Sequence, residues 1–291
     1  MMLLFYGVIF GYALIDAQTI VNGAKEGIRM ALTVVIPSLF PFIFLCTLSL
    51  QEISKNPLKF LRPVEKLCGI PRGSGILFLL GLIGGYPVGA QNVFKAHENR
   101  MIARNDAERM LGFCNNAGPS FIFGMVGGIL QDVRLCWLLW LTQILSATIT
   151  AALLPGKSAA NIKVQATQPS NIGLILEGVM KICAKIAGWV VLFRCLLSVL
   201  DNWCLPTIWR VCISGILELS NGCVRVQNID STYLQFMICG ILLAFGGLCV
   251  HLQTRSVTKG LSMRYYWIGK TIQTAISTPI LYILWKITVA F

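Results

Sequence analysis

The sequence predicts an all-α polytopic membrane protein built from two inverted repeats that contain re-entrant hairpins and broken helices. Of its 291 residues, 56% are hydrophobic and only 12% are charged, and the mean hydropathy is +0.72. A soluble protein of this composition would expose most of its apolar surface to water, so composition predicts the membrane class. Glycine clusters within the apolar runs predict the breaks.

Membrane-spanning segments can be located by length, because a helix crossing a hydrocarbon core of ~30 Å needs about 20 apolar residues. The segment 1–15 lacks a basic start, so residues 1–25 are expected to be a retained N-terminal transmembrane segment, with a cleaved leader as the alternative. Uncharged runs occupy 30–50, 73–94, 110–130, 135–156 and 231–254, and further apolar segments lie at 172–200 and 267–290.

Charge and cysteine patterns exclude several other classes. The net charge is +12, but the basic residues lie mainly in short loops, as the positive-inside rule expects, and this disfavours nucleic-acid binding. The 11 cysteines form no C-x-x-C pair, so no metal site or cofactor is expected. No nucleophile, base and orienting group occur at a recognisable spacing, so we do not expect an enzyme.

The order of features repeats along the chain. Each half reads as a helix, a glycine-rich segment, an interrupted span and a final helix, and residues 26–46 align on 177–195. Internal repeats of this kind are common in transporters, whose substrate site lies between them. The sequence therefore predicts a first repeat at 26–154, a polar linker at 155–171 and a second repeat at 172–291.

The uncharged run 73–94 holds six glycines and a proline, which ordinary spanning helices rarely combine. Irregular backbone at membrane depth is tolerated where it is buried in protein or lines a water-filled cavity. We therefore predict a re-entrant hairpin or a sharply broken span at 81–90, and its counterpart at 214–223. The alternative is close packing of continuous helices through small residues.

Loop charges bear on orientation. If each half contributes a hairpin and a broken span, the loops on one side hold fourteen Lys and Arg residues and those on the other side five. The richer side is expected to be cytoplasmic, and the halves are then inverted. A parallel arrangement gives fifteen against four, so charge does not separate the two. We prefer the inverted arrangement because 111–130 is one span long.

Ionisable groups at membrane depth are functional candidates because inserting them costs about 3 kcal/mol. Lys181 and Lys185 share a helix face with Glu177, and both lysines would attract an anion. Glu218 lies in the second glycine-rich segment and could neutralise them or bind a coupling proton. The alternatives are a surface pair between Glu177 and Lys181, a Lys185 that reaches the interface, and a Glu218 that caps backbone.

Uncharged polar groups and glycines at the predicted breaks complete the candidate site, since discontinuous helices bind solutes there in transporters. Alternatively, the polar groups only satisfy freed backbone, and His251 and Gln253 have the same ambiguity. The predicted substrate-binding residues are Gly84, Gly85, Tyr86, Pro87, Asn115, Asn116, Ser120, Lys181, Lys185, Glu218, Ser220, Asn221, Gly222, Gly246 and Gly247.

Four ordered motifs resemble one family: GLIGGYPVGA, FCNNAGPSFIFG, GILELSNG and AFGGLCVHLQ. They are similar to the YlbJ-type sporulation integral membrane proteins, which contain a nucleoside-recognition or Gate domain. The resemblance implies a fold like that of concentrative nucleoside transporters, with two inverted repeats. It also implies a multi-pass protein of the mother-cell or outer forespore membrane that moves dipicolinic acid during endospore formation.

The expected partners are accordingly a small anionic substrate, the lipid bilayer and a coupling ion, H⁺ or Na⁺. Whether the protein forms a homo-oligomer stays open. Two other functions remain as alternatives. One is a cation-coupled transporter of a nucleoside-type solute, and the other is a non-transporting sporulation membrane scaffold.

Overall fold

The computed structural model describes residues 11, 14–53, 58–158, 160, 171–202 and 204–290. Within these residues every helix or strand element is a helix, which confirms the all-α class. The predicted span at 1–15 and the linker at 155–171 lie largely outside the described residues. The predicted boundary between residues 25 and 26 falls within a continuous helical stretch.

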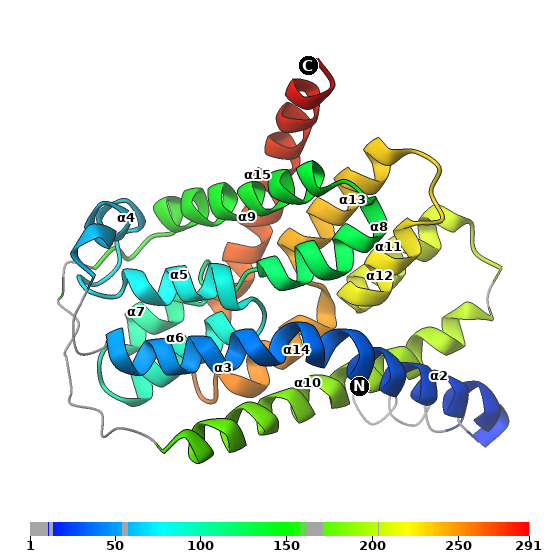
Figure 1. Cartoon of the computed structure of the whole chain (residues 1–291), viewed down its shortest axis with the longest axis horizontal. Coiled ribbons are helices and arrows are strands. Elements are labelled where there is room, and N and C mark those ends of the chain that lie inside the picture. Colours follow the sequence, from blue (N-terminus) through cyan, green and yellow to red (C-terminus); the bar gives the residue numbers. More distant parts are fainter. Residues whose placement is uncertain are drawn as a thin grey trace.

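In chain order the helical elements of the described residues are α2 (Ala17–Met30), a π-helical segment (Ala31–Val35), α3 (Ile36–Ile53), a 3-10 turn (Lys59–Leu61), α4 (Arg62–Cys68), α5 (Gly75–Gly84), α6 (Val88–Glu98), α7 (Arg104–Met110), a second π-helical segment (Ser120–Val126), α8 (Gly127–Leu130), α9 (Val133–Leu153), α10 (Ile172–Asp201), α11 (Thr207–Leu217), α12 (Leu219–Val226), α13 (Thr232–Phe245), α14 (Gly247–Val257) and α15 (Arg264–Ala290). Several helices, among them α9 and α10, run roughly along the long axis of the molecule, whereas α15 crosses it and its C-terminal end projects from the body (Figure 1).

Four of the described helical stretches are long and apolar enough to cross a membrane, which supports the predicted membrane class. They are Ala17–Leu48, Val133–Leu153, Ile172–Asp201 and Thr232–Val257. Large apolar side chains such as Leu32, Trp137 and Met180 are exposed on their outer faces. A lipid environment accommodates such side chains without the cost that water would impose.

Side-chain caps fix where several helices begin. Asp132 accepts a hydrogen bond from the backbone N–H of Arg134 at 2.8 Å, and Asn171 accepts one from Gly173 at 2.9 Å. These short polar side chains satisfy N–H groups that have no partner in the first turn of a helix. The starts of α9 and α10 are therefore encoded locally.

α2 and α10 pack closely in opposite chain directions. A Cβ added to Gly23 would overlap Ser198, and one added to Gly27 would overlap Val191. Since later residues of α2 face earlier residues of α10, the helices are antiparallel, and Figure 1 shows them side by side. Glycines four residues apart allow this approach of two backbones.

The two glycine-rich segments both form helical hairpins. In the first, α5 and α6 cross where a Cβ on Gly89 would overlap Gly81 and the carbonyl group of Cys114. In the second, α11 and α12 cross where a Cβ on Gly222 would overlap Gly215. The hairpins enter from opposite ends of the long axis, and their tips point toward the middle (Figure 1).

At both ends of the molecule, arginine side chains link segments that are distant in the sequence. At one end Arg109 is 2% exposed, and its guanidinium donates to the backbone carbonyls of Cys68, Gly69 and Ala151 at 2.8, 3.1 and 2.6 Å. These carbonyls satisfy the buried cation without a carboxylate. At the other end, Asp201 forms ion pairs with Arg194 and Arg225.

Candidate substrate site

The hairpin tips meet the two interrupted spans near the middle of the molecule. Gly85, with φ +75°, lies against Gly118 in the first break, between α7 and the π-helical segment at Ser120–Val126. Gly247, with φ +75°, lies against the tip of the second hairpin at Gly215 and Leu219. Positive φ angles favour glycine, so these residues allow the breaks and the tips to approach at backbone distance.

Tyr86 links the first hairpin to the second break. Its hydroxyl donates to the carbonyl of Leu243 at 2.6 Å, and its ring lies beside Gly246, where α13 ends and α14 begins. Pro87 follows it in the same turn and is the N-cap residue of α6. The first hairpin thus contacts both interrupted spans.

A buried lysine of α15 lies beside Tyr86. Lys270 is 0% exposed, and its Nζ is 4.9 Å from the centroid of the Tyr86 ring. The same Nζ donates to Gln273 Oε1 at 2.9 Å, to Tyr86 at 3.3 Å and to the Ala244 carbonyl at 3.4 Å. All three acceptors are neutral, and within the described residues no carboxylate pairs with this lysine.

An amide network extends from Lys270 to the first break. Gln273 Nε2 donates to Asn116 Oδ1 at 2.8 Å and lies 3.4 Å from Gln143 Oε1 of α9. Asn116 Nδ2 in turn donates to the Phe113 carbonyl at 2.7 Å. Gln273, Asn116 and Gln143 are all 0% exposed, so the two final helices α9 and α15 bring fully buried hydrogen-bonding groups to the break.

A second branch runs from Asn115 to α14. Asn115 Oδ1 accepts from the backbone N–H of Ala90 at 3.3 Å, and its Nδ2 donates to Thr254 Oγ1 at 2.8 Å. Thr254 is next to Tyr266, whose hydroxyl is 2.7 Å from His251 Nδ1. Part of this network therefore satisfies backbone groups that lack helical partners. This is the alternative role that the sequence analysis gave for the polar residues at the breaks.

Some buried polar atoms near these breaks have no hydrogen-bond partner among the described protein groups. They include Ser120 Oγ, Gln143 Nε2 and His251 Nε2. Buried polar groups in proteins are nearly always hydrogen-bonded, and exceptions often lie at functional sites. These three atoms could therefore bind a polar solute.

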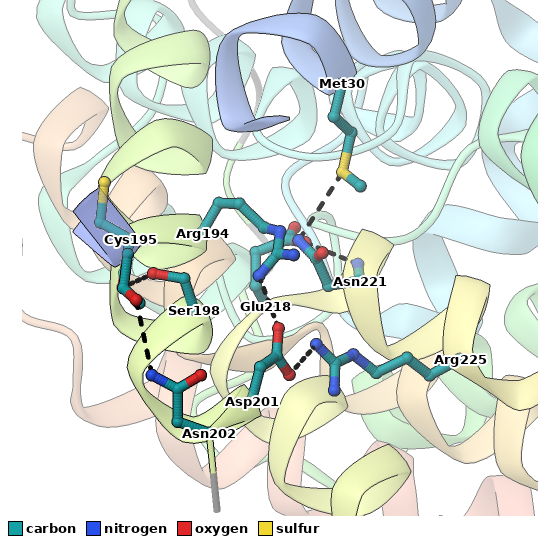
Figure 2. Close-up of polar contacts among 10 residues, drawn as sticks. Met30, Arg194, Cys195, Ser198, Asp201, Asn202, Glu218, Asn221 and Arg225 are labelled. Atoms are coloured by element: carbon teal, nitrogen blue, oxygen red, sulfur yellow. Dashed lines mark hydrogen bonds and ion pairs between the residues drawn. The ribbon is translucent and has the colours of Figure 1, made fainter. Parts of the chain in front are cut away.

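Glu218 forms a separate polar group at the tip of the second hairpin (Figure 2). Its carboxylate accepts hydrogen bonds from the backbone N–H groups of Ser220 at 3.1 Å and Asn221 at 2.7 Å, and from Asn221 Nδ2 at 2.7 Å. Glu218 is 2% exposed and is the N-cap of α12. These contacts match the alternative in which Glu218 caps backbone N–H groups. Gly222 lies in the first turn of the helix that follows.

Lys181 and Lys185 lie on the outer face of α10. The side chain of Lys181 is 71% exposed and pairs with Glu177, and Lys185 is also exposed. The buried face of α10 consists of other positions, among them Ile182 and Ile186. The structure therefore does not bring these lysines to the buried network. Glu177 and Lys181 instead form the surface ion pair that was the alternative interpretation.

Sequence reasoning missed Lys270 and Gln273. A signal was present, because Lys270 is an ionisable residue inside the apolar segment 267–290, and Gln273 follows it by three positions on the same helix face. The structure brings Tyr86, Asn115, Asn116 and Gly246 of the predicted set to this network. Ser220, Asn221, Gly222 and Gly247 gather instead around Glu218 and the second hairpin tip.

Comparison with known proteins supports the family resemblance. The chain is 24% identical to the sporulation integral membrane protein YlbJ of Bacillus subtilis (strain 168), in an alignment of 322 positions that covers 92% of this chain and 78% of that protein. The predicted resemblance to the YlbJ-type family is thereby confirmed. No family model matches the chain, and no solved structure matches it.

Proposed function

We propose that this relative of YlbJ is a membrane transporter of a small organic anion, and that dipicolinate is its substrate during endospore formation. The name of the relative supports a role in sporulation at a membrane. The buried polar network beside two helix breaks supports a solute site, because discontinuous helices bind solutes in many transporters. Dipicolinate, a pyridine dicarboxylate, is the cargo implied by the family resemblance.

Lys270 is the observation that carries the anion proposal. Burying a cation without a counter-charge is unfavourable by several kcal/mol, and Lys270 is fully buried with only neutral acceptors in the described residues. A bound carboxylate would supply the missing negative charge. Gln143 Nε2 and Ser120 Oγ, which have no hydrogen-bond partner among the described groups, are suited to a second carboxylate group.

We also propose that the two halves are inverted repeats. The proposal is supported by the repeated order of long helix, hairpin, interrupted span and final helix. It is further supported by the antiparallel packing of α2 and α10 and by hairpins that enter from opposite ends (Figure 1). Rocking of such repeats around a central site would expose Lys270 to each side of the membrane in turn.

The membrane and the coupling ion follow from the same proposal. A transporter that supplies a spore with dipicolinate would work in the mother-cell or outer forespore membrane. We propose H⁺ as the coupling ion, because a proton that crosses together with the anionic substrate reduces the net charge moved through the membrane. Na⁺ remains the alternative coupling ion.

Uptake of labelled dipicolinate into proteoliposomes tests the proposal. Lys270→Met, which removes the charge and keeps the length, should reduce uptake about tenfold or more, since losing ~1.4 kcal/mol of binding already gives that factor. Lys286→Met is the matched control on the same helix, because Lys286 lies over the Tyr282 ring and not in the network. Uptake that is unchanged in Lys270→Met contradicts the anion proposal.

The same assay compares Lys270 with the lysines selected from sequence. Lys185→Ala is expected to transport normally because its side chain is exposed. If Lys185→Ala instead loses uptake while Lys270→Met keeps it, the substrate path runs along α10 and the sequence-based assignment is right. Lys181→Ala serves as the neighbouring control.

A neutral nucleoside-type solute is the second candidate. It is favoured by the excess of neutral amides in the network, namely Asn115, Asn116, Gln143 and Gln273. Competition by nucleosides, together with uptake that does not depend on Lys270, would select this function. A membrane scaffold would show no specific uptake of either solute.

A further inference from the structure

A cavity opens at the end of the molecule where the second hairpin begins and ends. It measures about 430 Å³ and is lined by Asp201 of α10, Thr207, Arg210 and Val211 of α11, and Arg225 and Asn228 at the end of α12. It therefore lies at the opposite end of the hairpin from its tip at Glu218. Nothing in the proposed transport site includes these residues.

Among the described lining residues Asp201 is the one acidic side chain, and two arginines share it (Figure 2). Arg194 Nη1 lies 3.0 Å from Asp201 Oδ2, and Arg225 Nη2 binds Asp201 Oδ1. The arginine side chains are only 17% and 16% exposed. The ion pairs therefore hold both guanidinium groups in place beside the cavity.

Guanidinium groups outnumber carboxylates among the described residues of this cluster. Arg194, Arg210 and Arg225 contribute three positive charges, and Asp201 contributes one negative charge. Arg225 uses Nη2 for Asp201, and a guanidinium presents five N–H donors in a planar fork that matches a carboxylate. The remaining edge of this fork can bind a second anion.

The other lining groups are suited to the same ligand. Thr207 carries a hydroxyl and is the first residue of α11, where backbone N–H groups without helical partners favour an anion. Asn228 adds an amide. A volume of about 430 Å³ is within the range of small-molecule sites.

We propose that this cavity is a second anion site, which binds a small dicarboxylate at one face of the membrane before it reaches the buried site. Asp201 is the resident carboxylate, and the incoming anion competes with it for Arg225. The choice of a dicarboxylate rests on the proposed function. The anion site itself rests only on the arginines and the cavity.

Equilibrium dialysis of labelled dipicolinate against protein in phosphatidylcholine nanodiscs tests the site. The measurements use the Lys270→Met background, in which the buried site is disabled. Arg225→Gln should weaken the remaining binding about tenfold, because it removes a charge-assisted pair. Arg134→Gln is the matched control, since Arg134 is 79% exposed and paired with Asp132 outside the cavity.

A second variant changes the affinity in the opposite direction, which loss of folding cannot imitate. Asp201→Asn removes the competing carboxylate and should tighten binding several-fold, while Asp132→Asn should leave it unchanged. Unchanged binding in Arg225→Gln, or weaker binding in Asp201→Asn, overturns the inference.

The two proposals fail separately. If Lys270→Met does not impair uptake but Arg225→Gln weakens binding, the transport site is wrong and the cavity site stands. If Lys270→Met abolishes uptake and all binding is already lost in that background, the proposed function stands and the cavity site is wrong.

Discussion

The two glycine-rich hairpins are alike where their helices cross and different at their tips. Both crossings depend on paired glycines, Gly81 with Gly89 and Gly215 with Gly222. At the first tip, Tyr86 donates a hydrogen bond to the Leu243 carbonyl at the second break. At the second tip, the Glu218 carboxylate accepts hydrogen bonds from the start of its own helix, α12. Glycine therefore determines the shape of both hairpins, and the tip residue determines whether a hairpin joins the buried network.

This difference also separates the charges. The buried cation Lys270 lies at the first tip, where its described acceptors are neutral. The buried anion Glu218 lies at the second tip, where backbone N–H groups satisfy it. A charge satisfied by its own helix serves structure, while a charge with only neutral acceptors can accept a ligand. This contrast is the reason why we propose the first tip, and not the second, as the place of substrate recognition.

The largest effect on stability is expected where the two helices of each hairpin cross. Gly89→Ala would place a methyl group on the carbonyl oxygen of Cys114, and Gly222→Ala would place one on the Cα of Gly215. Backbone atoms cannot rotate away, so each variant should lose about 3 kcal/mol of unfolding free energy. Denaturant titration of the purified protein measures this, with a thiol-reactive dye as the signal because most of the cysteines are buried.

Gly188→Ala is the control for that prediction. Gly188 lies within α10, and an added Cβ would meet no atom within 4 Å. Alanine favours a helix over glycine by about 1 kcal/mol, so this variant should be unchanged or more stable. If Gly89→Ala and Gly222→Ala behave like Gly188→Ala, the hairpins are not held by close glycine contacts.

A smaller effect is expected at the second tip. Glu218→Ala removes the cap of α12 and leaves the N–H groups of Ser220 and Asn221 without their acceptor. The loss of an N-cap corresponds to about 1–2 kcal/mol of stability. Glu218→Gln keeps an acceptor oxygen and should recover part of it. Denaturant titration measures the stability, and dipicolinate uptake should be retained in Glu218→Gln.

Uptake by Glu218→Gln also separates a structural role of Glu218 from a role in transport. A structural cap predicts that Glu218→Gln transports normally. If this variant folds as well as the wild type but no longer transports, then Glu218 takes part in coupling or binding, as the sequence-based assignment expected. The second tip would then be as functional as the first.

The breaks could be predicted because glycine and proline act locally. The motif at 81–90 includes the turn residue Gly85, whose positive φ favours glycine. In the motif at 214–223 the chain turns at Glu218, and Gly215 and Gly222 instead let α11 and α12 pack closely. The network could not be predicted in the same way. Gln143 and Gln273 lie 130 positions apart and meet only because α9 packs against α15.

The lysines of α10 show a different limit. The buried stripe of Ile175, Val179, Ile182 and Ile186 has helical spacing, and both Lys181 and Lys185 fall outside it. This stripe is hard to recognise in a membrane protein because lipid-facing positions such as Met180 are also apolar. The spacing of the two lysines therefore indicated that they share one helix face. It did not indicate whether that face is buried or exposed.

The smallest effect is expected at the first tip. Tyr86→Phe removes a hydroxyl that donates to the Leu243 carbonyl and accepts from Lys270, and it keeps the ring beside Gly246. At about 0.5 kcal/mol for each of these two buried hydrogen bonds, the expected loss is about 1 kcal/mol, which denaturant titration can measure. Tyr282→Phe is the control, because Tyr282 is 48% exposed.

Transport should respond to this variant more than stability does. Lys270 loses one of its three described acceptors in Tyr86→Phe, so a bound carboxylate becomes a larger share of its stabilisation. We expect the KM for dipicolinate to change while the maximal rate stays close to that of the wild type, and Tyr282→Phe should change neither. A stability loss with an unchanged KM would mean that Tyr86 only joins the hairpin to the second break, and the contrast between the two tips would then be structural alone.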